Sequence, residues 1–185
     1  MGAYVLDADQ LCRDLVQPGQ IAFKEIVQNF GEDILDPGGN LDRAKLAQLV
    51  FANTEKKVIL EGILHPKVFE IEKKEYFKIK EKDTFAVVII NSALMIESGN
   101  YRNMDKLIVV QSSEEAQIQR ILSRSGMSYD ETMARIKNQM PLHEKIRYAD
   151  FILENNSLPQ DLKDRIQELY PQLVKLSRKA KNSIS

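Results

Sequence analysis

The chain has 185 residues, enough for one domain with a substantial core or one domain carrying a sizeable insertion. Lys and Arg total 26 and Asp and Glu total 27, so the net charge of −1 argues against a nucleic-acid coat or a membrane-surface protein. The single Cys12 excludes an internal disulfide and fits a reducing compartment. No apolar run reaches transmembrane length and the start lacks a basic signal region, so we expect a cytoplasmic protein.

The chain opens with a short apolar strand, Tyr4 to Leu6, followed by the carboxylates of Asp7 and Asp9. If the strand continues through Asp9, both carboxylates project to one face. If a turn begins at Ala8, one of them caps a helix over residues 10–16. For an isolated Asp-x-Asp, capping and solvation are the favoured interpretation. Acidic groups at the carboxyl end of a strand also lie where ligands bind in open α/β sheets.

Residues 17–82 are predicted to form a mostly helical block. Helical spacing indicates a helix over 21–30, and Asp42 and Thr54 are suitable N-caps for two more. The helix from Thr54 is expected to end at His65, because the residue before Pro66 avoids the helical region. A charged helix over 68–80 follows.

Continuous apolar runs at 85–90, 106–110 and 151–153 indicate strands that are covered on both faces. Helices are expected from Ser112 or Ser113 through Arg124, from Ser128 through Gln139, and from near Pro159, before a frayed polar tail that begins at Lys179. Strands alternating with helices predict an α/β fold with a mostly parallel sheet, and the inserted helices suggest a substrate lobe and a lid.

Basic residues gather between the last two predicted strands. They are Arg120, Arg124, Arg135, Lys145 and Arg147. The first two are four residues apart, as are Arg135 and Gln139, so each pair shares a helical face. Guanidinium groups over the end of a parallel sheet suit phosphate oxygens, although a solvated helix face explains the same spacing.

Two further residues have a structural and a functional interpretation. His65 is either a helix-end residue that bonds the last carbonyls or a ligand-binding residue. Glu97 follows the strand at 85–90, where it serves either as a cap or as a binding carboxylate.

Nearly the whole chain resembles the dephospho-coenzyme A kinase family. The matching motifs, in order, are Asp7-Ala8-Asp9 with Arg13; Leu41-Asp42-Arg43, Val50-Phe51, Leu60-Glu61 and Leu64-His65-Pro66; Leu94 to Glu97 with Tyr101 and Asp105; Arg120, Arg124, Arg135 and Gln139; and Ala149-Asp150 with Asn155-Asn156. Each motif alone is weak, but this many at matching intervals is a specific signal.

The resemblance implies transfer of the γ-phosphoryl group of ATP, with Mg²⁺, to the ribose 3′-hydroxyl of dephospho-coenzyme A, the last step of coenzyme A synthesis. Asp9 is then the general base and Asp7 an accessory carboxylate, one option being a place on the metal through water, although spacing does not separate the two roles. Arg13, His65 and Glu97 would hold the acceptor substrate. Arg120, Arg124, Arg135 and Gln139 would form the lid over the phosphates, with Asn155 and Asn156 at the nucleotide base.

The implied architecture is a single P-loop-kinase-like domain, with a parallel sheet flanked by helices. Residues 1–16 and 83–185 would form the core, residues 17–82 the helical substrate lobe and residues 120–148, approximately, the lid. The implied partners are the small-molecule substrates, with neither nucleic acid nor membrane, and the oligomeric state stays open.

The main departure from the family is that the first strand and the G-x-x-x-x-G-K-[ST] phosphate loop have no counterpart in these residues. We therefore expect open apolar edges on the strands at 85–90 and 106–110, and little or no kinase activity from these 185 residues. The expected natural product is a full kinase of which these residues lack the beginning. The alternatives are a non-catalytic relative that binds coenzyme A or dephospho-coenzyme A, and an interaction protein whose sheet a partner completes. Asn91, Ser92 and Ala93 also differ from the family's apolar-proline approach to Leu94.

Overall fold

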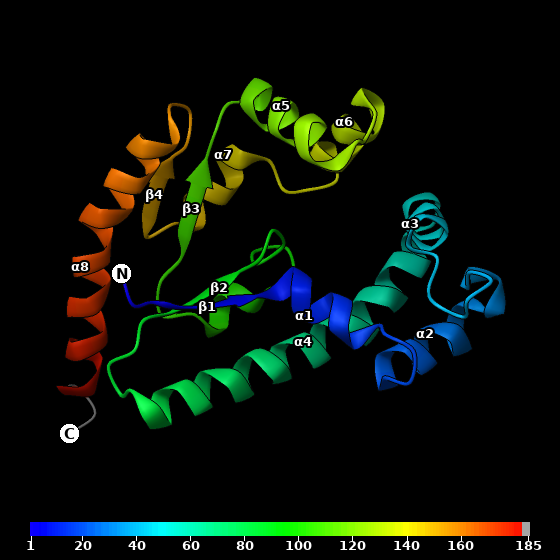
Figure 1. Ribbon diagram of the computed structural model, residues 1–185, viewed down its shortest axis with the longest axis horizontal. Coiled ribbons are helices and arrows are strands. Elements are labelled where there is room, and N and C mark those ends of the chain that lie inside the picture. Colours follow the sequence, from blue (N-terminus) through cyan, green and yellow to red (C-terminus); the bar gives the residue numbers. More distant parts are fainter. Residues whose placement is uncertain (183–185) are drawn as a thin grey trace. The chain divides into compact units, whose positions relative to one another are not determined.

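The apolar runs form strands that pair in parallel. In the computed structural model, β1 (Tyr4–Asp7) pairs with β2 (Val88–Asn91), and β3 (Ile108–Gln111) pairs with β4 (Phe151–Glu154) (Figure 1). These ladders are two separate two-stranded sheets. The expected α/β fold with parallel strands is confirmed, and within the residues that the structure describes each strand has one ladder neighbour.

The structure describes residues 1–182, which divide into two compact units. The first unit is Gly2–Ser92, and the second is Met1 with the chain from Ala93 onward. The finer division into core, substrate lobe and lid stays a prediction.

The first unit is built on β1 and β2 and four helices. The helices are α1 (Ala8–Leu15), α2 (Ile21–Phe30), α3 (Arg43–Ala52) and α4 (Thr54–Lys82). Helices α1, α2 and α3 all pack on α4. The core lies among the helices, where Ile26 and Ile34 are fully buried and pack with Leu46 and Ile63.

Helix α4 is one continuous element, so the expected helix end at His65 is wrong. The helix runs through Pro66, and Asn53 rather than Thr54 caps it by accepting the Lys56 N–H. Pro66 lacks an N–H for the carbonyl of Gly62, four residues earlier, and so weakens the helix locally. Burial of Ile63 before the proline and Val68 after it holds both halves in one helix.

The second strand is shorter than the apolar run that predicted it. The run begins at Phe85, whereas β2 begins at Val88. Residues 83–86 form a turn instead, in which the Asp83 side chain accepts the Phe85 N–H and the Asp83 carbonyl accepts the Ala86 N–H. Local hydrogen bonding of an aspartate has here overridden strand propensity.

The second unit contains β3, β4 and four helices. The helices are α5 (Glu114–Ser125), α6 (Tyr129–Lys137), α7 (Leu142–Lys145) and α8 (Pro159–Asn182). Ser113 caps α5, and Gly126 ends it in the left-handed conformation at φ 65°. Ser128 and Glu131 form the expected capping box of α6.

Two expected helix ends differ from the structure. Helix α6 ends at Lys137, so Gln139 lies beyond it rather than within it. Helix α8 packs on β4 and continues to Asn182, past Lys179, where fraying was expected to begin. Residues 183–185 of the tail lie outside the described residues.

None of the helices in the described part of the chain has the length and apolarity to span a membrane.

Candidate active site

The junction of β1 and α1 separates the two N-terminal carboxylates. Asp7 ends the strand and caps α1, accepting the Gln10 N–H at 3.0 Å on Oδ1. The Asn91 side chain on β2 donates to the other oxygen of Asp7 at 3.4 Å. The turn interpretation of this stretch is therefore confirmed: Asp7 is the cap, and Asp9 occupies the first helical turn.

Asp9 is exposed on α1, and Arg13 follows it one turn later. The positive end of the helix favours a carboxylate in the first turn. Asp9 and Arg13, one turn apart, place a carboxyl and a guanidinium group on one face of α1, which follows the carboxyl end of β1.

Cys12 reports the charges around α1. Burial raises the pKa of its thiol, and the negative charge of Asp9 raises the pKa further. The positive charge of Arg43, at the start of α3, lowers the thiol pKa, whereas the negative charge of Glu72 on α4 raises it, as Asp9 does. Three helices of the first unit therefore bring charged side chains close to Cys12.

His65 lies in the middle of α4, so its interpretation as a helix-end residue is wrong. The half-buried imidazole stacks on Phe69, with ring centroids 5.8 Å apart and an interplanar angle of 16°. Because α4 packs on α1, His65 belongs to the same unit as Asp9 and Arg13.

In the second unit, most of the predicted lid residues line one pocket of about 310 Å³. The lining side chains come from α5, α6 and the ends of β3 and β4, and are Ser112, Gln117, Arg120, Ile121, Arg124, Arg135, Ile136, Gln139 and Asn155. Three guanidinium groups in one pocket with few apolar neighbours suit the binding of a multiply charged anion chemically.

Hydrogen bonds fix the walls of this pocket. Arg120 donates from Nη2 to the Asn155 carbonyl at 2.7 Å, and Arg124 donates from Nε to the Arg120 carbonyl at 3.2 Å. Asn156 does not line the pocket but accepts the Ser113 N–H at 2.7 Å, so it supports the start of α5.

Glu97 is engaged by donors of the same unit. Its Oε1 lies 2.9 Å from the Lys145 ammonium and accepts the Met140 N–H at 2.9 Å. Burial raises the pKa of Glu97, but the hydrogen bonds from Lys145 and Met140 and the charge of Lys145 outweigh burial, so the carboxyl pKa lies below its ordinary value. Glu97 is therefore ionised at neutral pH.

Sequence reasoning missed several residues of this unit. Gln117 and Ile121 line the pocket, and their spacing of three residues from Arg120 and from Arg124, respectively, was the available signal. Lys145 belonged to the basic group that the sequence identified, but nothing in the sequence pairs it with Glu97.

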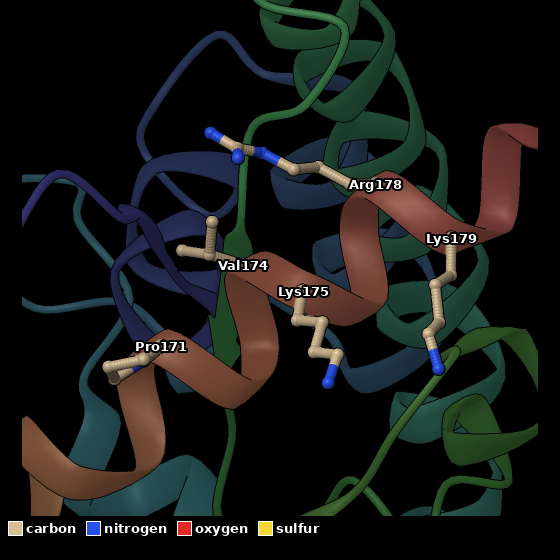
Figure 2. A pocket seen from close by; sticks show the side chains of 5 residues that line it. All are labelled: Pro171, Val174, Lys175, Arg178 and Lys179. Carbon is tan, nitrogen blue, oxygen red and sulfur yellow. The ribbon is translucent and has the colours of Figure 1, made fainter.

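A second hollow, of about 380 Å³, is lined by Pro171, Val174, Lys175, Arg178 and Lys179 of α8 alone. Figure 2 shows that Arg178 extends to a different side of the helix from Lys175 and Lys179. Because these cations do not converge on one point, the pocket with the arginines is the better candidate for the chemistry.

For a divalent metal, the described residues contain no group of three or more His, Cys, Asp or Glu side chains. A Mg²⁺ ion that retains waters and binds nucleotide phosphates needs only one or two protein carboxylates. The exposed Asp7 and Asp9 satisfy that requirement chemically.

Comparison with known proteins places these features in one family. The family model for dephospho-CoA kinase matches residues 1–161. The dephospho-CoA kinase of Aquifex aeolicus is 40% identical over 176 residues, which cover 95% of this chain and 87% of the relative.

Two solved structures agree with the sequence comparison. The crystal structure of TT1252 from Thermus thermophilus has a TM-score of 0.75 and 29% identity, covering 93% of this chain and 85% of that chain. The dephospho-CoA kinase from Campylobacter jejuni has a TM-score of 0.64 and 28% identity, covering 94% and 86%. The chain therefore belongs to the dephospho-CoA kinase family, whose enzymes are phosphotransferases of coenzyme A biosynthesis that use ATP as co-substrate.

Proposed function

We propose that the two units divide the substrates of this kinase reaction between them. The unit Gly2–Ser92 carries the residues for dephospho-CoA, and the unit from Ala93 onward carries the residues for the triphosphate of ATP. The single observation that supports this proposal most is the gathering of Arg120, Arg124 and Arg135 in one pocket.

Asp9 acts as the general base on the acceptor. The ribose 3′ oxygen bonds to the γ-phosphorus as the bond from that phosphorus to the β,γ-bridging oxygen breaks, and Asp9 takes the hydroxyl proton. The assignment is supported by the hydrogen bond that commits Asp7 to capping α1, whereas Asp9, which is exposed as well, takes no part in that cap. ADP is the leaving group.

Arg13 and His65 bind the acceptor substrate. Arg13 supplies a guanidinium for a phosphate oxygen of dephospho-CoA, and the half-buried His65 supplies a ring nitrogen. Glu97, the third predicted acceptor residue, belongs to the other unit, and its contact with the acceptor stays a prediction.

Arg120, Arg124 and Arg135 neutralise charge on the phosphates, with Gln139 as a neutral donor beside them. Asn155 and Asn156 follow β4 and form the side of the site for the nucleotide base. Mg²⁺ would be held by the phosphates, water and Asp7, and would supply further neutralisation of the transferring group. The proposed setting is the cytoplasm, with small-molecule substrates as the partners.

These 185 residues contain no G-x-x-x-x-G-K-[ST] motif, whose backbone N–H groups and lysine grip the phosphates in other nucleotide kinases. We therefore expect dephospho-CoA binding with little or no turnover. A coupled assay of ATP consumption with dephospho-CoA tests this expectation. Robust turnover that Asp9→Asn abolishes would show that the motif is dispensable here, and robust turnover that survives Asp9→Asn would also remove Asp9 as the base.

A further inference from the structure

Lys145 does not line the arginine pocket, yet its ammonium contacts the side chain of Gln139, which does. We propose that Lys145 is a positioning residue, which fixes the segment Gln139–Pro141 at the end of the lid by pairing with Glu97. This inference rests on the proposed function of the pocket as the triphosphate site.

Three acceptors converge on the Lys145 ammonium. The Glu97 carboxylate lies at 2.9 Å, the Ala93 carbonyl at 3.0 Å and the Gln139 side-chain oxygen at 3.5 Å. The ammonium therefore joins the segment 93–97 to the residue that follows α6 and lines the pocket.

The Glu97–Lys145 pair is better shielded than a typical surface pair. The Lys145 side chain is 16% exposed and that of Glu97 is 22%, against 43% and 34% for the Lys106–Asp150 pair of the same unit. Less solvent means less screening, so the shielded pair holds its geometry more strongly than an exposed pair does.

The pair also controls the main chain. The same Glu97 oxygen that faces Lys145 accepts the Met140 N–H at 2.9 Å. Gln139 and Met140 follow the C-cap of α6 and precede Pro141, the N-cap of α7. Short-range hydrogen bonds hold the two ends of this stretch, from the Gln139 N–H to the Ile136 carbonyl and from two α7 N–H groups to the Pro141 carbonyl, and Glu97 holds Met140 between them. Lys145 thus holds the Met140 backbone indirectly, through Glu97, and contacts the Gln139 side chain directly.

Without the ammonium, the Gln139 side chain loses its partner and Glu97 loses the charge that orients it. The pocket then has to order Gln139, and with it the end of the helix that carries Arg135, when an anion binds. That ordering cost appears as weaker binding, although no group that touches the anion has changed.

The experiment compares Lys145→Met, which keeps the length and removes the charge, with Lys145→Arg, which restores the charge. Lys106→Met is the matched control, because it breaks an ion pair of the same unit that lies outside the pocket. Two readouts are measured on the folded chain: hydrogen exchange of the Met140 amide, and calorimetric binding of ATP.

We expect Lys145→Met to speed exchange of the Met140 amide and to weaken ATP binding, each by about fivefold or more. Lys145→Arg is expected to restore most of the Met140 protection and most of the ATP affinity. Lys106→Met is expected to change neither quantity. If Lys145→Met does not fold, Glu97→Gln is used, with the same expectations for both readouts.

Unchanged Met140 exchange in Lys145→Met would overturn the inference. Faster exchange with unchanged ATP binding would also overturn it, because the pair would then be structural only. If the unmodified chain binds no ATP, the proposed function of the pocket fails, and the positioning role fails with it. The unmodified chain's own titration therefore distinguishes the two failures.

Discussion

Arg120 of α5 donates to the carbonyl of Asn155, directly after β4, at 2.7 Å. This hydrogen bond joins segments 35 residues apart in the sequence and sets one wall of the arginine pocket. Arg120 is therefore committed partly to the fold, whereas Arg135 is an exposed residue of α6.

The two arginines should consequently respond differently to removal. Arg120→Ala is expected to lower the free energy of unfolding by about 1–3 kcal/mol, because a charge-assisted hydrogen bond is lost, and to weaken ATP binding as well. Arg135→Ala is expected to weaken ATP binding by about tenfold with little change in unfolding free energy. Urea unfolding and calorimetry measure the two quantities.

Lys137→Ala is the control for Arg135→Ala, since it removes the same charge from α6 outside the pocket. Equal losses of ATP affinity in Lys137→Ala and Arg135→Ala would mean that net charge alone explains the binding.

The Cys12 thiol should report the charge of Asp9. Because burial and Asp9 raise the thiol pKa, alkylation by iodoacetamide at pH 8 is expected to be slower than that of a free cysteine. Asp9→Asn removes a negative charge, lowers the thiol pKa and should speed the reaction, whereas Arg43→Gln should slow it. Asp14→Asn is the control, because Asp14 is not among the charged residues that shift the Cys12 pKa, and it should leave the rate unchanged. A rate insensitive to Asp9→Asn would place Asp9 outside this cluster.

Stability of the second unit should depend on pH through Asp150. Hydrogen bonds from Lys106 and the Leu107 N–H, at 2.6 and 2.8 Å, outweigh burial and lower the pKa of this carboxyl group. A lowered pKa stabilises the fold above the ordinary carboxyl pKa, and the contribution disappears as the pH falls through the lowered value. The free energy of unfolding is measured between about pH 2 and pH 7. Below about pH 4 it should fall less steeply in Asp150→Asn than in the unmodified chain. Parallel pH profiles of the two proteins would contradict the lowered pKa.

Pro66 should cost stability without setting the helix boundary. Pro66→Ala restores the N–H that the Gly62 carbonyl lacks and is expected to raise the free energy of unfolding by about 1–3 kcal/mol. Thermal and urea unfolding measure this gain. A loss of stability would show that the proline is needed where it is, for example to position His65 beside it.

The sequence predicted the caps and strands better than the helix boundaries. Asp42 and Ser128 were predicted as N-caps, and so was one of Ser112 and Ser113, because an oxygen side chain before a helical pattern has a definite role. The predicted cap Thr54 was wrong, since Asn53 caps α4. The passage of α4 through Pro66 was not predictable from local rules, because burial on both sides of the proline decides it. Tertiary packing thus overrode a local signal.

For the site, helical spacing predicted which arginines share a face, and the family resemblance rather than the spacing predicted their role at the phosphates. Positions four residues apart on a helix share a face whatever the fold, so Arg120 with Arg124 could be foreseen as one wall. The contacts of Glu97 with Lys145 and Met140 join residues more than 40 positions apart, and no local pattern encodes them.

The most direct test of the account is a calorimetric titration of the chain with dephospho-CoA. The account predicts saturable binding with one site per chain, weakened about tenfold or more by Arg13→Ala and unchanged by Lys57→Ala, which removes an equal charge from α4. Absence of binding, or equal binding by the unmodified chain and Arg13→Ala, would contradict it.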